Sequence, residues 1–418
     1  MMRWLYTIGI RLYGFAVWFA AHYNRKAADW MAGRQHWKTT LASEVNTPGP
    51  PWVWVHCASL GEFEQGRNLI DHLYDHHPEF RVLVTFFSPS GYQIRSKYAK
   101  AHHVAYLPLD TPANARAFLN LVSPAFGIFI KYELWLNLLR EAARLSLPLI
   151  LVAARPHPDK PALRWPLRSL FVEGYRSFQH IFTQDEESRL LLESLGHPSV
   201  SVSADTRFDR VAANRRQWQA LPEIERFLGG RSCLVAGSTW PKDEELLLAA
   251  WAKLPDHVRP RLIIAPHEIH PERMEARIAA FPQRELCYGE ISQAQETHEI
   301  LWIDRIGLLS RLYAYGKVAY VGGAFDKGLH NILEAAVFGC SLIIGPAYQR
   351  FPEAIDLVSE GACTSVKNEA EFLLALETRL LNFELLENHS RITEAYVAQR
   401  EGATKKILTW MMQQNWLS

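Results

Sequence analysis

Two consecutive series of short apolar runs, each alternating with helix-like stretches, constrain the fold of this chain more than any other feature. Runs rich in β-branched and aromatic residues, without polar alternation, are typical of parallel strands buried on both faces. Intervening segments such as 62–77 and 112–121 have the composition of helices. The alternation predicts a doubly wound α/β sheet. The expected strands of the first series cover residues 52–56, 82–87, 104–107, 125–130, 149–153 and 180–183.

The second series begins near residue 231 and has the same character. A chain of 418 residues is too long for one ordinary core, so two domains are expected. We therefore predict an α/β fold of two doubly wound Rossmann-like domains facing a central cleft, with ligands at the carboxyl ends of both sheets. The expected strands of this series cover residues 232–236, 261–265, 285–288, 300–303, 318–321 and 341–344.

Changes in composition along the chain predict its domain boundaries. An aromatic and basic segment covers 1–45, and the first domain is expected over 46–208. The charged stretch 209–230 is expected to be a linker, followed by the second domain over 231–395. Residues 396–418 are expected to form a C-terminal helix that packs back across the hinge.

The N-terminal segment combines aromatic residues with an excess of cations. Residues 1–45 hold six Lys or Arg against two acids, and the run from Trp4 to Tyr23 is almost wholly apolar. Because Arg11 lies near the middle of that run, a helix crossing a bilayer would be costly. Aromatics mixed with cations suit a helix lying in the membrane interface. The segment is therefore expected to associate with a membrane surface, and a buried N-terminal helix is the alternative.

Net charge and cysteine usage exclude several classes of protein. A formal net charge of +1 excludes a general polyanion binder, so no nucleic acid is expected as a partner. The five cysteines have no CxxC spacing, which argues against a disulfide framework and against a zinc site. They are expected to be buried thiols in a reducing compartment.

The first motif, residues 56–62 with the sequence HCASLGE, ends the first expected strand. A strand, a tight turn at Gly61 and a helix place Glu62 in the first helical turn, at the edge where ligands bind. Free backbone N–H groups at a helix start favour an ionised carboxylate, the form that a general base needs. A helix-starting Glu that only complements the helix dipole is the alternative.

The second motif, residues 131–135 with the sequence KYELW, follows the expected strand 125–130. Its position at the carboxyl end of a strand predicts that Glu133 converges with Glu62 on one site. Glu133 is then expected to bind an acceptor hydroxyl or to position Glu62. A surface or capping carboxylate is the alternative.

The third motif, Gly237-Ser238-Thr239-Trp240, is expected between the first strand of the second domain and an acidic helix. Small hydroxylic residues and a glycine at such a turn can hold a phosphate with backbone donors. Residues 265–273 also follow a strand and bring His267, which can contact a phosphate or a sugar carboxylate. The spacing of acids and histidines there fits no helical metal-ligand pattern, so no metal is expected.

The fourth motif runs from Gly322-Gly323 after a strand to a helix expected to start around His330–Asn331. The glycines allow the backbone to approach a ligand closely. The helix N-terminus would hold a leaving phosphate, and Glu334 would accept hydrogen bonds from ribose hydroxyls. Without a P-loop, this combination indicates a nucleotide-sugar donor.

Together these segments resemble the 3-deoxy-D-manno-octulosonic acid (Kdo) transferases of lipopolysaccharide synthesis. The matching segments, in the family's order, are HCASLGEFEQG, KYELW, ADTRFD, AGSTWPKDEE, APHEIHPER, VGGAFDKGLHNILEAAVFG and IIGP. The resemblance implies a GT-B fold and inverting, metal-independent and cofactor-free transfer of Kdo from CMP-Kdo to a lipid A precursor. It also implies a location at the cytoplasmic face of the cell inner membrane.

The resemblance also assigns roles to residues. Glu62 matches the family's general base and Glu133 its second cleft acid. The residues expected to bind CMP-Kdo are Arg207, Ser238, Thr239, His267, Gly322, Gly323, His330, Asn331 and Glu334, and those expected on the acceptor side are Ser59, Gly61 and Lys131.

The chain departs from the family pattern at a few positions. Leu329 and Ala335 stand where many members have Gly and Pro, Leu136 replaces a Pro, and a Pro-Arg-His pattern becomes Pro266-His267-Glu268. These departures leave the individual phosphate ligands open. A GT-B transferase or epimerase using a UDP-sugar is the nearest alternative. A Rossmann oxidoreductase, disfavoured because GxGxxG is missing, and a lipid-binding scaffold are the others.

Overall fold

The computed structural model describes residues 2–131, 133–156, 168–281 and 284–418. The chain divides into two compact units, one formed by residues up to Arg210 together with Gly402–Ser418, and the other by Val211–Glu401. The division falls inside helix α10 (Thr206–Arg216). The stretch 209–230, expected to be a linker, holds the boundary between the units near its start, most of α10 and all of α11 (Pro222–Leu228).

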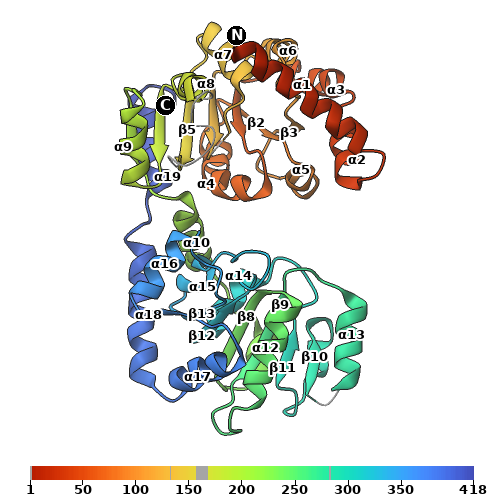
Figure 1. Cartoon of the computed structure of the whole chain (residues 1–418), viewed down its shortest axis with the longest axis vertical. Helices are drawn as coiled ribbons and strands as arrows, with labels where there is room; N and C mark the ends of the chain where they lie inside the picture. The colour runs from red at the N-terminus through yellow and green to blue at the C-terminus, as the bar shows by residue number, and fades with distance from the viewer. Residues whose placement is uncertain (1, 132, 157–167, 282–283) are drawn as a thin grey trace. The chain divides into compact units, whose positions relative to one another are not determined.

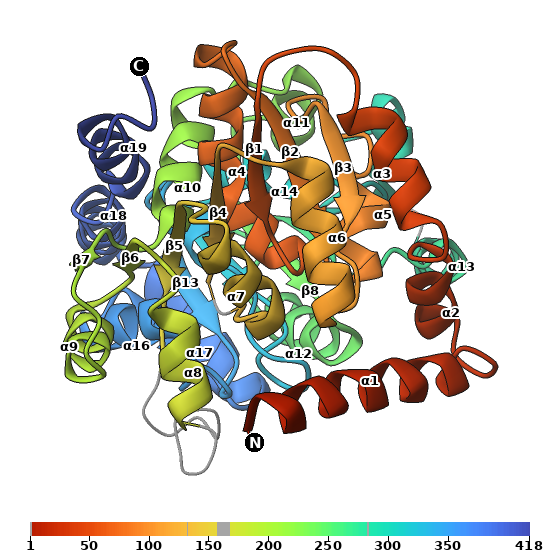
Figure 2. The ribbon, with the colours of Figure 1, turned by 90° about the horizontal axis from the view of Figure 1, so that it is seen from above.

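The first unit is built on a seven-stranded parallel sheet in the order β3-β2-β1-β4-β5-β6-β7 (Figures 1 and 2). Its central strands are buried on both faces, as their continuous apolar sequences predict. The strands are β1 (Trp52–His56), β2 (Arg81–Phe86), β3 (His103–Tyr106), β4 (Phe126–Ile130), β5 (Leu149–Ala154), β6 (His180–Thr183) and β7 (Val200–Val202).

Helices cover both faces of this sheet. One core contains Phe63 of α4 together with Ile407 and Met411 of α19, and the other contains Phe118 of α6 and Leu139 of α7. The C-terminal helix thus completes the first unit, and the second unit ends at Glu401. The helices are α1 (Met2–Ala20), α2 (Arg25–Ala32), α3 (Trp37–Val45), α4 (Leu60–His76), α5 (Pro89–Arg95), α6 (Pro112–Val122), α7 (Leu136–Arg144), α8 (Arg168–Tyr175), α9 (Glu186–Ser194) and α19 (Ala403–Gln413).

The second unit repeats the design with a parallel sheet in the order β10-β11-β9-β8-β12-β13-β14. The strands are β8 (Cys233–Thr239), β9 (Arg261–Pro266), β10 (Glu285–Cys287), β11 (Ile300–Trp302), β12 (Val318–Val321), β13 (Ser341–Ile344) and β14 (Cys363–Ser365). The remaining helices are α12 (Pro241–Ala252), α13 (Pro271–Ala280), α14 (Leu309–Leu312), α15 (Leu333–Ala336), α16 (Pro352–Ser359), α17 (Glu369–Leu380) and α18 (Phe383–Ala398).

Each sheet has one edge strand that the apolar pattern does not predict. β7 has the sequence Val-Ser-Val and is half-exposed throughout, and β14 reads Cys-Thr-Ser. Both are three residues long and form an edge of their sheet, so they need no apolar run on both faces. The expected strands are all present, and their ends differ from the predicted ones by at most three residues.

The order of strands reverses once in each sheet. In the first unit the reversal lies between β1 and β4, which pair directly, with His56 opposite Phe129. In the second it lies between β8 and β12, with Gly237 opposite Val321. In open parallel sheets the crossover helices leave to opposite faces at such a point, and a crevice opens at the carboxyl ends of the two strands. These two places are where ligands are expected.

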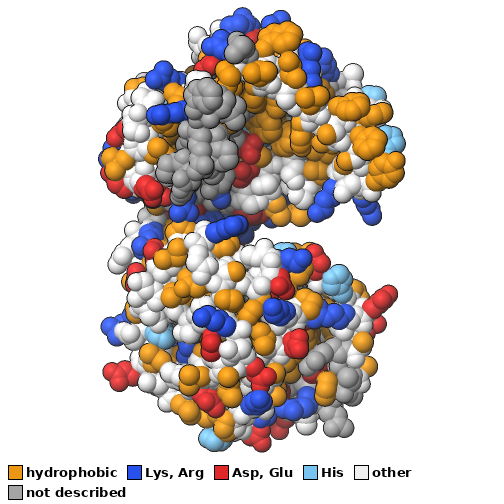
Figure 3. Space-filling model, viewed as in Figure 1, with side chains coloured by type: hydrophobic (Ala, Val, Ile, Leu, Met, Phe, Trp, Pro, Cys, Tyr) orange, Lys and Arg blue, Asp and Glu red, His pale blue; other side chains and the backbone are white. Residues whose placement is uncertain are grey.

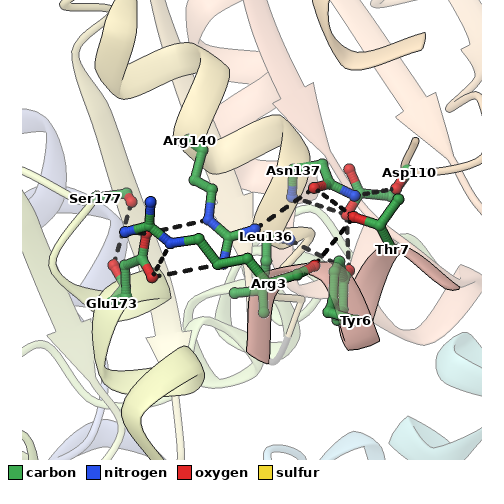
Figure 4. Close-up of polar contacts among 9 residues, drawn as sticks. All are labelled: Arg3, Tyr6, Thr7, Asp110, Leu136, Asn137, Arg140, Glu173 and Ser177. Atoms are coloured by element: carbon green, nitrogen blue, oxygen red, sulfur yellow. Dashed lines mark hydrogen bonds and ion pairs between the residues drawn. The ribbon is translucent and has the colours of Figure 1, made fainter. Parts of the chain in front are cut away.

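Polar contacts fix the first turns of α1 to the first unit (Figure 4). Tyr6 donates a 2.7 Å hydrogen bond to Asp110, which also accepts the backbone N–H groups of Asn137 and Leu138 at the start of α7. Arg3 pairs with Glu173 at 2.8 Å. Among the described helices, none is both long and apolar enough to cross a membrane.

Candidate functional site

Glu62 lies in the first turn of α4, at the carboxyl end of β1, as predicted. Its carboxylate accepts the backbone N–H of Ser59 at 2.9 Å, and its side chain is 7% exposed. Burial raises its pKa, and the Ser59 N–H and the charge of Lys131 oppose that rise. The helix start therefore moderates the effect of burial and does not outweigh it, which corrects the expectation of a simply favoured carboxylate.

Glu133 belongs to the loop that follows β4, on the other side of the strand reversal. Burial, together with the negative charge of Glu62, raises its pKa to about 7. The two carboxyl groups are thus close enough to interact electrostatically, although the chain separates them by some seventy residues. Near neutral pH the pair can hold one proton. The ionised carboxylate is then a base, and the protonated carboxyl group is a hydrogen-bond donor. Tyr132 of the same motif lies outside the described residues.

The acceptor-side residues predicted from sequence surround this pair. Ser59 caps α4, and its hydroxyl lies 3.4 Å from a carboxylate oxygen of Glu62. A Cβ at Gly61 would have the Ser59 hydroxyl as its nearest neighbour, at 4.0 Å, so this position lies beside the cap of α4. Lys131 has a positive φ of 75° and lowers the pKa of Glu62 through its charge.

A buried histidine that the sequence-based reading did not single out joins the two loops. His56, the last residue of β1, accepts a 2.9 Å hydrogen bond at Nε2 from the Trp135 indole N–H. Its Nδ1 lies 2.9 Å from the Thr85 hydroxyl of β2. Burial lowers the pKa of His56 to about 3, so the ring is neutral and fits an acceptor at Nε2. His56 therefore connects the ends of β1 and β2 to the loop that carries Glu133.

Arg207 belongs to the first unit, whereas the other residues predicted to bind the donor belong to the second. Its guanidinium pairs with Asp205 at 2.9 Å, and the amide of Gln65 on α4 lies 3.4 Å from the same carboxylate. Arg207 thus lies in a polar cluster that shares helix α4 with Glu62.

In the second unit, Asp243 at the start of α12 organises the strand reversal. Its carboxylate accepts the backbone N–H groups of Trp240 at 2.8 Å and Gly323 at 2.9 Å, and the Tyr320 hydroxyl at 2.5 Å. A side chain at Gly322 would meet the Ser238 carbonyl at 2.5 Å, and Gly323 has a φ of +96°. The backbone after β12 is therefore packed against the end of β8 where only glycine fits.

Ser238 and Thr239 form the end of β8 and not a turn after it, which corrects the predicted strand boundary. Ser238 has a φ of +52° beside a bulge in the pairing of β8 with β9. The Thr239 hydroxyl donates to Glu244 at 2.9 Å, so a neighbouring carboxylate already holds that group. Of the two, Ser238 is the better placed to contact a ligand.

Three aromatic rings stack beside the Gly322-Gly323 backbone. His267 stacks on His330 with ring centroids 4.2 Å apart, and Trp240 lies 4.9 Å from His267. The Trp240 indole N–H also donates to Nε2 of His330 at 3.2 Å. Burial, together with the neighbouring His267, lowers the pKa of His330 to about 4, so this ring is neutral. His330 is therefore a polar aromatic contact and not a cation.

The helix predicted to start around His330–Asn331 begins later, at Leu333, and has four residues. Gly328, just before this stretch, has a φ of +100°, and residues 328–331 form an irregular segment ahead of the helix. Asn331 accepts the backbone N–H of Leu333 at 3.2 Å, and its amide donates to Glu334 at 3.3 Å. Glu334 is half-buried and oriented by Asn331, whereas so short a helix contributes little dipole.

Most of the predicted residues therefore lie beside the strand reversal of their unit, whereas Arg207 lies on α10, after the edge strand β7. Among the residues that the structure describes, no group of three His, Cys, Asp or Glu is placed to hold a metal ion.

Known proteins share both the sequence and the fold. The family described as "3-Deoxy-D-manno-octulosonic-acid transferase (kdotransferase)" matches residues 33–210. A 3-deoxy-D-manno-octulosonic acid transferase of Rickettsia bellii is 30% identical over 353 residues, which cover 82% of each chain. One from Bordetella pertussis is 26% identical over all of both chains.

Solved structures show the likeness of the fold alone. The UDP-GlcNAc 2-epimerase from Neisseria meningitidis bound to UDP-GlcNAc aligns with a TM-score of 0.63 at 15% identity, over 87% of this chain and all of that one. A putative UDP-N-acetylglucosamine 2-epimerase from Listeria monocytogenes gives 0.61 at 12% identity, over 88% and 97%. The expected GT-B fold class, with two doubly wound α/β domains, is confirmed. With the sequence relationships, it follows that this chain belongs to the family of Kdo transferases, which are glycosyltransferases.

Proposed function

We propose that this chain transfers Kdo from CMP-Kdo to a lipid A precursor, lipid IVA, with inversion at the anomeric carbon. The observation that carries the proposal is the pair Glu62 and Glu133 at the strand reversal of the first unit, in a chain of the Kdo transferase family. A coupled pair of buried carboxyl groups supplies a base and a hydrogen-bond donor at neutral pH. Activation of a sugar hydroxyl requires such a base to accept its proton and such a donor to orient it.

In this proposal Glu62 is the general base. The acceptor hydroxyl oxygen attacks the anomeric carbon of Kdo while its proton passes to the Glu62 carboxylate. The bond from that carbon to the phosphate oxygen of CMP breaks, and CMP leaves with the electron pair. Direct displacement of this kind inverts the anomeric configuration. The Ser59 N–H and the charge of Lys131 favour the ionised form of Glu62 and offset part of the cost of its burial.

Glu133 acts in its neutral form. With a pKa of about 7 it keeps a proton over much of the neutral range and can donate a hydrogen bond to the acceptor or to the sugar carboxylate of the donor. A second carboxylate at this position would repel that sugar carboxylate. His56 holds the loop of Glu133 through Trp135, and thus acts as a positioning residue.

The donor is assigned to the strand reversal of the second unit. Glu334, oriented by Asn331, is placed to accept hydrogen bonds from ribose hydroxyls. The Gly322-Gly323 backbone and Ser238 offer close approach to the phosphate, and neutral His330 offers a polar ring. Donors fixed around a leaving phosphate stabilise the charge that develops there.

Helix α1 supports a location at a membrane surface, proposed here to be the cytoplasmic face of the inner membrane. Large apolar side chains are exposed along it, among them Phe15 (63%) and Phe19 (59%). Figure 3 shows hydrophobic side chains gathered in an area over α1. Arg11, Arg25 and Lys26 supply cations beside this area.

The first prediction concerns the base. Replacing Glu62 by Gln is expected to lower kcat about 10²–10⁴-fold, because the hydroxyl loses its proton acceptor, while CMP still binds. Product formation from CMP-Kdo and lipid IVA, followed by mass spectrometry, measures this. The control is Glu187→Gln, an exposed first-turn acid of α9. Near-normal transfer by the Glu62 variant contradicts the assignment.

The second prediction concerns pH. Because the pKa of Glu133 is about 7, the proposed neutral donor is present below that pH and is lost as pH rises through it. The wild-type kcat/KM is therefore expected to fall above about pH 7. In Glu133→Gln, which keeps an N–H donor and cannot ionise, that decline is expected to disappear. A decline that persists unchanged in this variant assigns the transition to another group.

The third prediction concerns the nucleotide. CMP is expected to raise the unfolding temperature more than UDP does at equal concentration, and Glu334→Gln is expected to weaken CMP binding about tenfold, since a hydrogen bond to a charged group is lost. Glu360→Gln, an exposed acid of the same unit, is the control. A larger stabilisation by UDP would indicate a UDP-sugar enzyme of the same fold.

The fourth prediction concerns the membrane. The double variant Phe15→Ser, Phe19→Ser is expected to sediment with anionic phospholipid vesicles at least about fivefold less than wild type, because apolar area is removed from the contact. The control is Leu374→Ser, Leu381→Ser, which removes equally exposed apolar side chains from the second unit. Equal sedimentation of the α1 variant and wild type would contradict the proposed role of α1.

A further inference from the structure

Helix α1, helix α2 and the loop before α6 enclose a groove that the proposed chemistry does not use. Its volume is about 630 Å³, within the range of small-molecule sites. Gly14 of α1 forms one side, and Leu109 of the loop forms another. The remaining wall is one face of α2. All of these residues belong to the first unit.

The wall of the groove is mainly apolar. Ala28, Met31, Ala32 and Gln35 are spaced three or four residues apart and so share one face of α2 and its C-terminal turn. Because Ala28 and Ala32 have small side chains, the groove remains wide at this wall. The aromatic lining residues are Trp30 and Trp37, and the polar ones are Arg11, Arg34, Gln35 and Asn114.

The groove is a fixed feature because α1 is held in place on the first unit. At its N-terminal end, Tyr6 bonds Asp110 and Thr7 bonds Asn137, and both side chains point from α1 toward the start of α7 (Figure 4). Farther along, α1 approaches Leu109 so closely that a side chain at Gly14 would meet it at 2.7 Å. The hydrogen bonds of Tyr6 and Thr7 and the packing of Gly14 against Leu109 together fix α1 beside α2.

Two arginines line the groove, and they differ in what they can offer a ligand. Arg34 is buried, and its guanidinium donates to the carbonyls of Leu107, Phe87 and Trp30. Its centre also lies 3.9 Å from the Trp30 ring. Arg11 is exposed, and no carboxylate pairs with it within the described part of the chain. The charge available to a ligand is therefore that of Arg11.

We propose that this groove holds one acyl chain of the glycolipid acceptor, with an anionic group of that glycolipid at Arg11. An apolar wall with a single accessible cation matches a lipid that has a chain on one side and a phosphate on the other. The exposed apolar side chains of α1 adjoin the groove, so a chain can pass from a lipid surface into it. The proposal rests on the proposed function, because it takes the acceptor to be a lipid A precursor.

The test uses the full chain and a photoactivatable probe, a long-chain alkyl phosphate with a diazirine in the chain. After irradiation, peptide mapping is expected to find the label on α2 residues of the groove and on Leu109. Unlabelled lipid IVA is expected to lower this labelling about tenfold, and phosphatidylethanolamine at the same concentration is expected to change it less than about twofold.

Two variants with matched controls locate the site. Ala32→Phe fills the groove, and Arg11→Gln removes its cation; each is expected to lower labelling at least about fivefold. Ala16→Phe, on an exposed position of α1 outside the lining, and Arg116→Gln, an exposed cation of α6 outside the lining, are expected to label within about twofold of wild type.

An activity measurement separates this proposal from the proposed function. With lipid IVA, Ala32→Phe is expected to raise KM about tenfold with little change in kcat, and with a deacylated acceptor the variant and wild type are expected to match. If wild type transfers no Kdo while lipid IVA still displaces the probe, the proposed reaction is contradicted and the proposed lipid site is supported. Three results overturn the groove: label confined to the exposed face of α1, undiminished labelling of Ala32→Phe, or equal displacement by phosphatidylethanolamine.

Discussion

The reversal of strand order, once in each parallel sheet, is the constraint on which the rest of the structure depends. At β1 and β4, and again at β8 and β12, neighbouring strands send their helices to opposite faces and leave their carboxyl ends uncovered. Glu62 follows β1, and Glu133 follows β4, so two loops distant in the chain meet. The Gly322-Gly323 backbone meets the end of β8 by the same rule. The proposed chemistry uses the carboxyl ends of the strands at these two reversals, which no crossover helix covers.

At each reversal, one buried carboxylate accepts hydrogen bonds from several neighbouring segments and so fixes their relative positions. Asp243 satisfies three donors from α12, β12 and the turn after β12. Buried polar groups are stable only when paired, so losing any one of these partners would leave a charge unsatisfied. Asp110 has the same role at the start of α7, where it also receives Tyr6 of α1. The N-terminal helix is thereby tied to the element that follows the loop of Glu133.

Sequence patterns predict the central strands because those strands are buried on both faces and must be apolar. They fail at β7 and β14, where short edge strands carry serine and threonine. The start of α15 is predicted two to three residues too early, because composition alone does not separate the irregular segment before it from the helix. Glu62 and Glu133 are recognisable by their places after strands. The bond between His56 and Trp135 joins residues far apart in the chain, and nothing local signals it.

Because His56 is neutral, the geometry that it fixes does not depend on the protonation state of the nearby carboxyl groups. Burial lowers the pKa of this imidazole to about 3, so across the physiological range the ring gains no proton. The tie between β1 and the loop after β4 therefore keeps its shape while the neighbouring carboxyl pair exchanges protons. A site built in this way can change charge without changing dimensions. In the proposed mechanism, pH then sets how many molecules are in the reactive protonation state and does not change the positions of the two carboxyl groups.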